Sequence, residues 1–290
     1  MKNNVLLLAA IILLGVTACT DQESEIYAFP EQEMIAFSGL MTRVDVTYPE
    51  KEYKLSITAQ LDNATDYINE ATAVFAADGT ITFDENKQFY YPLNNNNLHF
   101  FAHSGERVEG NNILLIAGQV KETSDALLSN GWDGSSLTAA TGTVGSFWNP
   151  LEKLIFRHVM TFLEVIVESD NAAANNNLDL SQNNVQFQCN EGYAQGTLPL
   201  TATNNTATKK GDEKYTIQNG INYLVPTGGT IANMSSLVIG DYTATTDDLN
   251  NLTIAGVNGE SLKLLPGKAY TLRFKIKDQK LQGVELTSNK

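Results

Sequence analysis

Only two cysteines occur in this 290-residue chain, and the first stands where a cysteine could be acylated. A basic residue and an apolar run over residues 5–14 precede it. That run is too short to cross a bilayer, because a spanning helix needs about 20 apolar residues. The sequence Val-Thr-Ala-Cys at residues 16–19 then has the order of a lipobox. We predict that residues 1–18 are a lipoprotein signal peptide, with cleavage between Ala18 and Cys19 and the lipid on Cys19.

An ordinary secretory signal that happens to contain a cysteine is the alternative interpretation of this stretch. The lipid would have a clear physical consequence. Each buried methylene contributes about 0.8 kcal/mol, and stable anchoring needs more than one acyl chain. A lipidated N-terminal cysteine provides this anchor.

The second cysteine, Cys189, has no intramolecular partner if Cys19 is acylated. It alternates with Val185 and Phe187 on one face of an expected strand, which is typical of a small buried hydrophobic residue. A reactive thiol is the alternative. In either case no disulfide stabilises the fold, so its stability must come from core packing.

The search for catalytic and metal-binding patterns gives mostly negative results. His99 and His103 are four residues apart, and on a strand this spacing separates them by about 13 Å, too far to share one ion. The third histidine, His158, stands alone. The sequence has no nucleophile elbow, paired-cysteine motif, phosphate-binding loop, calcium loop or dinucleotide fingerprint. We therefore predict no enzyme activity, no metal and no cofactor.

The net charge of −14 limits the partners that the chain can bind through charge. Nucleic acids and anionic membranes attract basic surfaces, so an acidic chain is not expected to bind either of them electrostatically. We predict no nucleic-acid partner.

Period-two alternation of apolar residues predicts strands along most of the chain. The expected strands cover residues 53–61, 72–75, 80–83, 98–103, 113–117, 154–168 as one long central strand, 185–189, 236–239 and a last hairpin over 270–287. The only expected helix covers residues 123–130, and Gly131 would end it. Many short strands with very little helix predict an all-β chain of β-sandwiches.

Composition also predicts where the chain divides. Residues 133–147 are rich in Gly, Ser, Thr and Ala, and a proline breaks the pattern just beyond them. We place a junction there, between an N-terminal domain at residues 27–149 and a C-terminal domain at residues 150–290. An acidic leader at residues 19–26 precedes the first domain.

Several stretches together resemble the fimbrillin family, the pilin-like lipoproteins of Bacteroides-type bacteria (Mfa-like and FimA-like subunits). They are the lipobox with its acidic leader at residues 19–25, an apolar strand at residues 34–40 that leads to Thr42-Arg43, Tyr90-Tyr91-Pro92-Leu93 with residues 98–103, residues 154–160 with 163–165, and the turn and strand at residues 266–272. The match spans nearly the whole mature chain.

The resemblance implies two tandem transthyretin-like β-sandwich domains with Greek-key-type strands. It also implies a structural or adhesive subunit of a cell-surface fimbria. Such a subunit is exported as a lipoprotein precursor and is held on the outer membrane through acylated Cys19. An Arg-specific protease then cuts it between Arg43 and Val44, and it polymerises by strand exchange. The implied partners are other fimbrial subunits, the lipid bilayer and a host or bacterial surface ligand.

In that scheme residues 34–40 are a provisional strand that a better strand later replaces. Ile35, Phe37 and Leu40 would give it moderate burial. The last hairpin, residues 270–287, would either donate the replacing strand or simply complete the C-terminal sandwich.

A different class of function is the alternative to a fimbrial subunit. Trp132, Trp148 and Tyr90-Tyr91 could form a sugar-stacking surface beside the loop at residues 133–147. The chain would then be a monomeric surface lipoprotein that binds glycans through a β-sandwich loop face. Packing in the core or at a strand edge is the plainer role for these aromatic residues.

Overall fold

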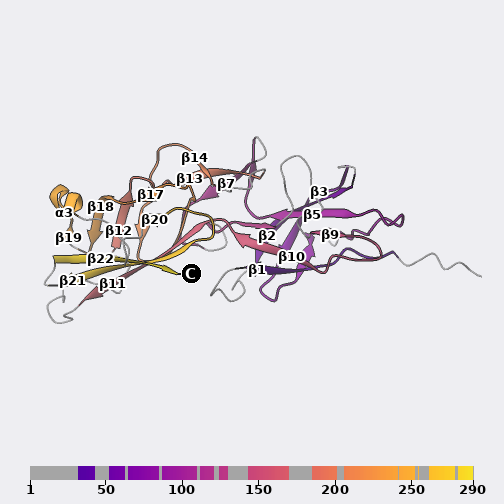
Figure 1. The fold of residues 1–290 in the computed structure, drawn as a ribbon, viewed down its shortest axis with the longest axis horizontal. Coiled ribbons are helices and arrows are strands. Elements are labelled where there is room, and N and C mark those ends of the chain that lie inside the picture. The colour runs from indigo at the N-terminus through magenta and orange to yellow at the C-terminus, as the bar shows by residue number, and fades with distance from the viewer. Residues whose placement is uncertain are drawn as a thin grey trace, which may run out of the picture. The chain divides into compact units, whose positions relative to one another are not determined.

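The computed structural model describes residues 32–42, 52–62, 65–84, 87–109, 112–120, 124–129, 143–169, 185–200, 206–240, 242–251, 254, 261–277 and 280–289. Over these residues the chain is almost entirely β-structure, as predicted (Figure 1). The strands are β1 (Ser38–Thr42), β2 (Tyr53–Leu61), β3 (Asp66–Phe75), β4 (Ile81–Phe83), β5 (Leu98–His103), β6 (Arg107–Val108), β7 (Asn112–Ile116), β8 (Leu127–Ser129), β9 (Val144–Gly145), β10 (Lys153–His158), β11 (Thr161–Ser169), β12 (Val185–Cys189), β13 (Gln195–Pro199), β14 (Thr208–Lys209), β15 (Ile217–Gln218), β16 (Gly220–Leu224), β17 (Thr230–Ile231), β18 (Met234–Ile239), β19 (Tyr242–Thr243), β20 (Leu262–Lys263), β21 (Ala269–Lys277) and β22 (Lys280–Asn289).

The strands form several sheets. The largest has the order β1-β10-β8-β5-β2-β3-β4, with β9 added beside β5. Three four-stranded sheets have the orders β16-β11-β21-β22, β15-β12-β18-β19 and β14-β13-β7-β6, and β17 pairs with β20.

The eight-stranded sheet follows directly from alternation in the sequence. Strands β2 and β5 begin and end at the predicted residues. Tyr53, Leu55 and Ile57 of β2 point into a core, while Lys54 between them is exposed. This alternation fixes the register of the sheet, because a shift by one residue would turn every apolar side chain toward water.

The predicted helix at residues 123–130 is wrong over residues 127–129, while residues 123 and 130 lie outside the described ranges. Residues 127–129 form β8, which pairs with His103 of β5 and with Phe156–His158 of β10. Leu127, Leu128 and Ser129 are all buried. A helix would leave one face of these residues in water, so packing between two strands overrides the local helical preference.

The long strand predicted over residues 154–168 is two strands. β10 ends at His158 and β11 begins at Thr161, with Val159 and Met160 between them. The two strands belong to different sheets. The break was hidden in the sequence because Val159 and Met160 are themselves apolar and buried.

The helix α3 (Thr246–Asn251) was not predicted. Thr245 caps it: the Thr245 amide donates to Asp248 Oδ2 at 2.8 Å, and the Asp248 amide donates to Thr245 Oγ1 at 3.2 Å. This reciprocal pair is a capping box, and Thr245 followed three residues later by an acidic residue is its sequence signal. No helix in the described ranges has the length and apolar character needed to cross a membrane.

The last hairpin, predicted over residues 270–287, is confirmed as β21 and β22. β21 lies between β11 and β22, running parallel to β11 and antiparallel to β22. Its apolar face packs into the C-terminal core, where Phe274 meets Phe187 edge-to-face with ring centroids 5.5 Å apart.

The predicted domain boundary at residues 149–150 stays a prediction. Three strand pairings cross it. β10 lies in the eight-stranded sheet beside β1 and β8, and β7 pairs with β13. Residues 34–290 form one compact unit.

We expect Phe274→Ala to lower the free energy of unfolding by about 3–5 kcal/mol, because it leaves a cavity in a fully buried core. Urea unfolding followed by fluorescence measures this change. Gln282→Ala on the exposed side of β22 is the matched control and should stay within about 0.5 kcal/mol of the parent. A small effect of Phe274→Ala would contradict the placement of β21 in the core.

Candidate functional site

The N-terminal segment, defined here as residues 34–42, is held largely through its backbone. Its second half is β1, which pairs in parallel with Lys153–Arg157 of β10 (Figure 1). The Ser38 amide also donates to the Glu152 carbonyl at 3.0 Å. β1 and β10 are more than 100 residues apart in sequence, so this pairing closes a long loop.

The first half of the N-terminal segment contacts the stretch that leads into β5. Met34 forms a β-bridge with Tyr90, and the Ile35 amide donates to the Phe89 carbonyl at 2.8 Å. These are single contacts rather than a continuous ladder. The strand therefore begins at Ser38, whereas the sequence predicted a start at Met34.

The other edge of the N-terminal segment contacts the turn before β4. Ser38 bridges Thr80, and the Gly39 amide donates to the Gly79 carbonyl at 2.7 Å. The N-terminal segment thus has backbone partners on both sides, β10 on one and the turn between β3 and β4 on the other.

Two side chains anchor the N-terminal segment in the core. Ile35 and Phe37 are 3% and 6% exposed, while Met34 is 46% exposed. The Phe37 ring lies edge-on to Phe100 and Phe83, with centroids 5.4 and 6.1 Å away. The alternation predicted from sequence is therefore correct at Ile35 and Phe37; the side chain of Leu40 lies outside the described part.

Gly39 lies directly against an aromatic ring. A Cβ at this position would stand 2.5 and 2.7 Å from two ring carbons of Phe75. Phe75 is fully buried and stacks on Phe156 at 5.2 Å, so it has no room to move aside. Only glycine allows the N-terminal segment to lie this close. An isolated glycine in an apolar strand is the sequence signal for such an approach, and the sequence interpretation missed it.

The N-terminal segment does not fill the space around it. An open pocket of about 280 Å³ lies beside residues 34–36 and β4, lined by Ile35, Ala36, Ile81 and Phe83 among others. The described part of the N-terminal segment thus buries two apolar side chains and leaves space beside them, so a strand that filled this space would gain more packing.

The predicted processing residues lie outside the described ranges. Ala18, Cys19, Arg43 and Val44 are all in this group, and the lipid and protease predictions stay predictions. β1 ends at Thr42, the residue before Arg43.

The last hairpin completes a sheet in this structure, which is the second of its two predicted roles. Its inner face is buried, through Leu272, Phe274, Ile276 and Leu286. β21 has a strand on each side, whereas β22 is an edge strand with β21 as its only partner within the described sheet.

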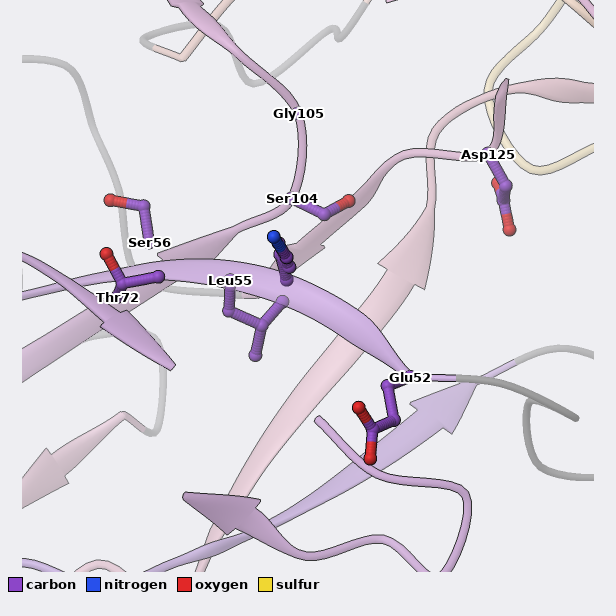
Figure 2. Close-up of a pocket in the computed structure, with 8 residues that line it drawn as sticks. Glu52, Leu55, Ser56, Thr72, Ser104, Gly105 and Asp125 are labelled. Atoms are coloured by element: carbon purple, nitrogen blue, oxygen red, sulfur yellow. The ribbon is translucent and has the colours of Figure 1, made fainter. Parts of the chain in front are cut away.

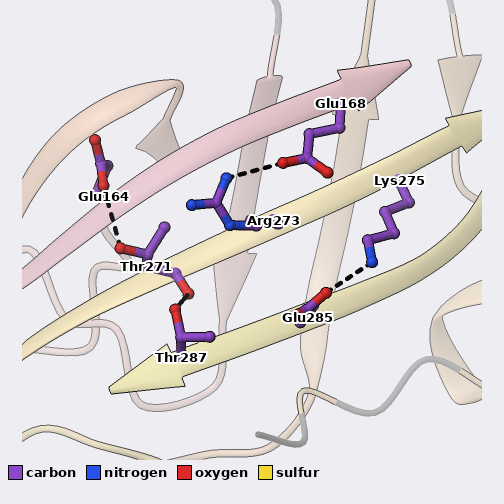
Figure 3. A network of polar contacts seen from close by, with 7 residues as sticks. All are labelled: Glu164, Glu168, Thr271, Arg273, Lys275, Glu285 and Thr287. Carbon is purple, nitrogen blue, oxygen red and sulfur yellow. Dashed lines mark hydrogen bonds and ion pairs between the residues drawn. The ribbon is translucent and has the colours of Figure 1, made fainter. Parts of the chain in front are cut away.

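The outer face of the hairpin carries polar cross-strand contacts (Figure 3). Arg273 pairs with Glu168 of β11 at 2.8 Å, and Lys275 pairs with Glu285 of β22 at 2.7 Å. The Lys275 ammonium holds the pKa of Glu285 below its usual value. Exposed ion pairs of this kind contribute little to stability, so burial of the inner face holds the hairpin in place.

The three histidines do not meet in space as a metal site. His99 Nε2 lies 2.7 Å from Asp62 Oδ1, and His158 Nδ1 lies 2.5 Å from Asp125 Oδ2. Burial lowers the pKa of His103, which favours the neutral ring. Across the described ranges no three metal-ligating side chains come together.

Cys189 is a buried hydrophobic residue, as its alternation predicts. It is fully buried on β12, in the C-terminal core. Burial raises the pKa of its thiol to about 12, so the thiol stays protonated and unreactive near neutral pH.

The aromatic residues proposed for sugar stacking differ in their exposure. Tyr91 is buried, and its hydroxyl accepts a hydrogen bond from the Leu151 amide at 2.9 Å. Trp148 is 72% exposed and stands edge-on to buried Phe147. Trp132 lies outside the described part of the chain.

The fold and its sequence are similar to known proteins. The family model described as fimbrillin-like matches residues 42–290. The crystal structure of a candidate cell adhesion protein from Bacteroides uniformis covers 88% of this chain and 96% of its own, with a TM-score of 0.59 at 15% identity. A second such protein, from Bacteroides ovatus, covers 89% and 96%, with a TM-score of 0.57 at 13% identity. At these identities the two structures show the fold alone. No curated protein matches the sequence.

We expect Gly39→Ala to loosen the N-terminal segment. The added methyl group would overlap the Phe75 ring, and overpacking costs about 1–3 kcal/mol. Each 1.4 kcal/mol raises the detached fraction about tenfold. Limited trypsin digestion, followed by mass spectrometry, should therefore cut much faster at Arg43.

Ala36→Ser is the matched control, because Ala36 is exposed in the same segment. Its cleavage rate should equal that of the parent. Equal rates for Gly39→Ala and the parent would show that the contact with Phe75 does not hold the segment.

Proposed function

Since this chain belongs to the fimbrillin-like family, we propose that it is a cell-surface fimbrial or adhesin subunit whose N-terminal segment is a replaceable strand. In this proposal the chain is exported as a lipoprotein precursor with its lipid on Cys19. A protease cuts after Arg43, the N-terminal segment leaves, and a strand from another subunit takes its place. The role is structural and adhesive rather than enzymatic.

The backbone contacts of the N-terminal segment support this proposal most directly. It is paired on both sides yet contributes only Ile35 and Phe37 to the described core. Its departure would expose Phe75 and Phe100 together with the unpaired edge of β10. An exposed strand edge beside an apolar groove is a site at which another strand adds.

A simple energy comparison supports the replacement. A large apolar side chain gains about 2 kcal/mol when it is buried, so the two described anchors contribute about 4 kcal/mol. A strand with four such side chains would gain about 8 kcal/mol on the same scale. The open pocket of about 280 Å³ beside Ile35 offers room for part of that difference.

Within this proposal β22 is the part of the last hairpin that is easiest to release. Release of β21 would break its eight-residue parallel pairing with β11. Release of β22 would break one ladder and uncover Leu286. The donor strand of a neighbouring subunit is therefore expected to be an edge strand rather than a central one.

A second candidate function is glycan binding by a monomeric surface lipoprotein. The exposure of Trp148 on a loop favours it, because an exposed tryptophan has an apolar face for a sugar ring. The two candidates predict different oligomeric states after proteolysis.

We expect low-dose trypsin to cut the purified chain after Arg43 and to start polymerisation. Loss of the N-terminal segment leaves the edge of β10 open to a strand from another copy, and assemblies closed in this way dissociate slowly. Ladders on unboiled SDS gels, with the new N-terminus identified by mass spectrometry, are the measurement.

Two variants make this test specific. Arg43→Gln should abolish both the cut and the ladders. Lys51→Gln, which removes the next tryptic site, should leave both unchanged. A chain cut at Arg43 that remains monomeric would contradict strand exchange between copies and favour the glycan-binding monomer or a related subunit as the partner.

We expect Cys19 to take up a fatty acid in cells. When the precursor is produced in a Bacteroides-type host fed an alkyne analogue of palmitate, the label should appear on the parent chain and not on Cys19→Ala. Cys189→Ala removes the other cysteine and should keep the label. Label on Cys19→Ala, or none on the parent, would show that the residues before Cys19 are an ordinary secretory signal.

A further inference from the structure

The outer face of β10, beside the N-terminal segment, is basic, although the chain as a whole carries a net charge of −14. Lys153, Ile155 and Arg157 share this face, because they alternate with residues that are buried in the core. Lys153 is exposed, Ile155 is 40% exposed and Arg157 is half-buried. A strand that pairs with β10 at this edge therefore meets two positive charges on one face.

Arg157 is the unusual residue of this face. Its Nε atom is buried and has no hydrogen-bond partner. None of the ion pairs among the described residues includes Arg157. Burial lowers the pKa of its guanidinium. A partly buried cation without a partner is costly, because it loses contact with water and gains no ion pair in return.

The neighbours of Arg157 across the sheet do not supply an anion. The row of cross-strand residues that begins at Arg157 continues through Leu128 of β8, His103 of β5, Ser56 of β2 and Thr72 of β3. Ser56 and Thr72, at the far end of the row, line an open pocket (Figure 2). Burial lowers the pKa of His103, which favours the neutral ring. No member of this row carries a carboxylate.

The buried carboxylate of Asp125, just before β8, is engaged elsewhere. Asp125 Oδ2 accepts a hydrogen bond from the Tyr53 hydroxyl at 3.1 Å and lies 2.5 Å from His158 Nδ1. Tyr53 and His158 belong to the buried faces of β2 and β10, whereas Arg157 belongs to the outer face of β10. Asp125 therefore binds groups on the core side of the sheet and leaves Arg157 unpaired.

The N-terminal segment does not supply the missing charge either. In its parallel ladder with β10, Thr42 lies opposite Arg157 and Ser38 lies opposite Lys153, and neither residue type is charged. Neighbouring strands are about 4.8 Å apart, a distance that an acidic side chain can span. A carboxylate opposite Arg157 would turn the unpaired cation into a charge-assisted pair.

We propose that the strand that replaces the N-terminal segment carries a carboxylate opposite Arg157, and that Arg157 thereby selects acidic strands over uncharged ones. This inference rests on the strand replacement proposed above and adds the chemistry of the partner. The partner is a strand of another subunit with an acidic side chain on its outer face. Exposed Lys153 attracts the same charge during approach, but water screens it, so it adds little to the final affinity.

Peptide exchange tests the proposal. The purified chain is cut after Arg43 with trypsin, the protease is inhibited, and a fluorescent peptide of residues 32–42 is added in excess to compete with the N-terminal segment. Fluorescence polarisation gives the affinities of the parent, Thr42→Glu and Thr42→Lys peptides. The Thr42→Glu peptide should bind about fivefold more tightly than the parent, and the Thr42→Lys peptide should bind more weakly.

Two controls make the test specific. In an Arg157→Met chain, which keeps an apolar stem and removes the charge, the parent and Thr42→Glu peptides should bind equally. A Ser38→Glu peptide places its carboxylate opposite exposed Lys153, so its affinity should stay within about twofold of the parent.

The uncut chain gives an independent test in which no strand is exchanged. Thr42→Glu should raise the urea midpoint of the parent chain, and the rise should vanish in the Arg157→Met background. A cooperative urea transition shows that Arg157→Met is folded. Equal rises in both backgrounds would show that a carboxylate at residue 42 does not pair with Arg157 and would overturn the proposal.

The exchange experiment separates this inference from the proposed function. If the parent and Thr42→Glu peptides enter with equal affinity, strand replacement stands and the selective role of Arg157 is wrong. A preference for Thr42→Glu that persists in the Arg157→Met chain would also overturn the inference, since the carboxylate would then bind elsewhere. If no peptide enters, the parent included, strand replacement itself is contradicted and this inference falls with it.

Discussion

The stack of Phe75 on Phe156 fixes where the N-terminal segment can lie. The two ring centroids are 5.2 Å apart and both rings are fully buried, so together they form a rigid surface under the segment. Gly39 packs directly on the Phe75 ring. Because Gly39 has no side chain to keep the backbone away from this ring, its amide can reach the Gly79 carbonyl. The parallel pairing of β1 with β10 begins at the preceding residue. One aromatic pair thus determines both the position of the segment and the shape of the space that it occupies.

The two ends of the described chain are held in different ways. The N-terminal segment has backbone partners on both sides, and among its described side chains only Ile35 and Phe37 are buried apolar groups. At the other end, β21 has a long parallel ladder with β11 and an apolar inner face. Because a backbone ladder can be rebuilt by any strand and a packed core cannot, the first is suited to replacement and the second to permanence. This asymmetry supports the proposed order of events, in which the N-terminal segment leaves and the β21 core remains.

The sequence predicts the fold where one face of a strand is buried and the other is wet. β2 is of this kind, and its bounds follow from alternation alone. Where both faces are buried, prediction succeeds for β5 but fails at residues 127–128 and 159–160. Leu127 and Leu128 look helical, and the break at Val159 and Met160 is invisible, because uniform apolarity carries no period.

The candidate site also has features that the sequence predicted and features that it did not. Ile35 and Phe37 could be predicted from alternation, since they share one face of an expected strand. The contact between Gly39 and Phe75 could not, because it joins residues 36 positions apart in sequence. The contact of Asp125 with His158 and Tyr53 was also beyond prediction, since sequence alone does not bring a carboxylate that precedes β8 to a histidine on β10.

The parallel direction of the β1–β10 ladder has a consequence for assembly. A strand that takes over this ladder with the same hydrogen bonds must run the same way along β10, since the parallel pattern differs from the antiparallel one. In a filament built through this edge, every joint would repeat that direction. The filament would then be polar, with one end presenting an open groove and the other a strand that has no groove to enter.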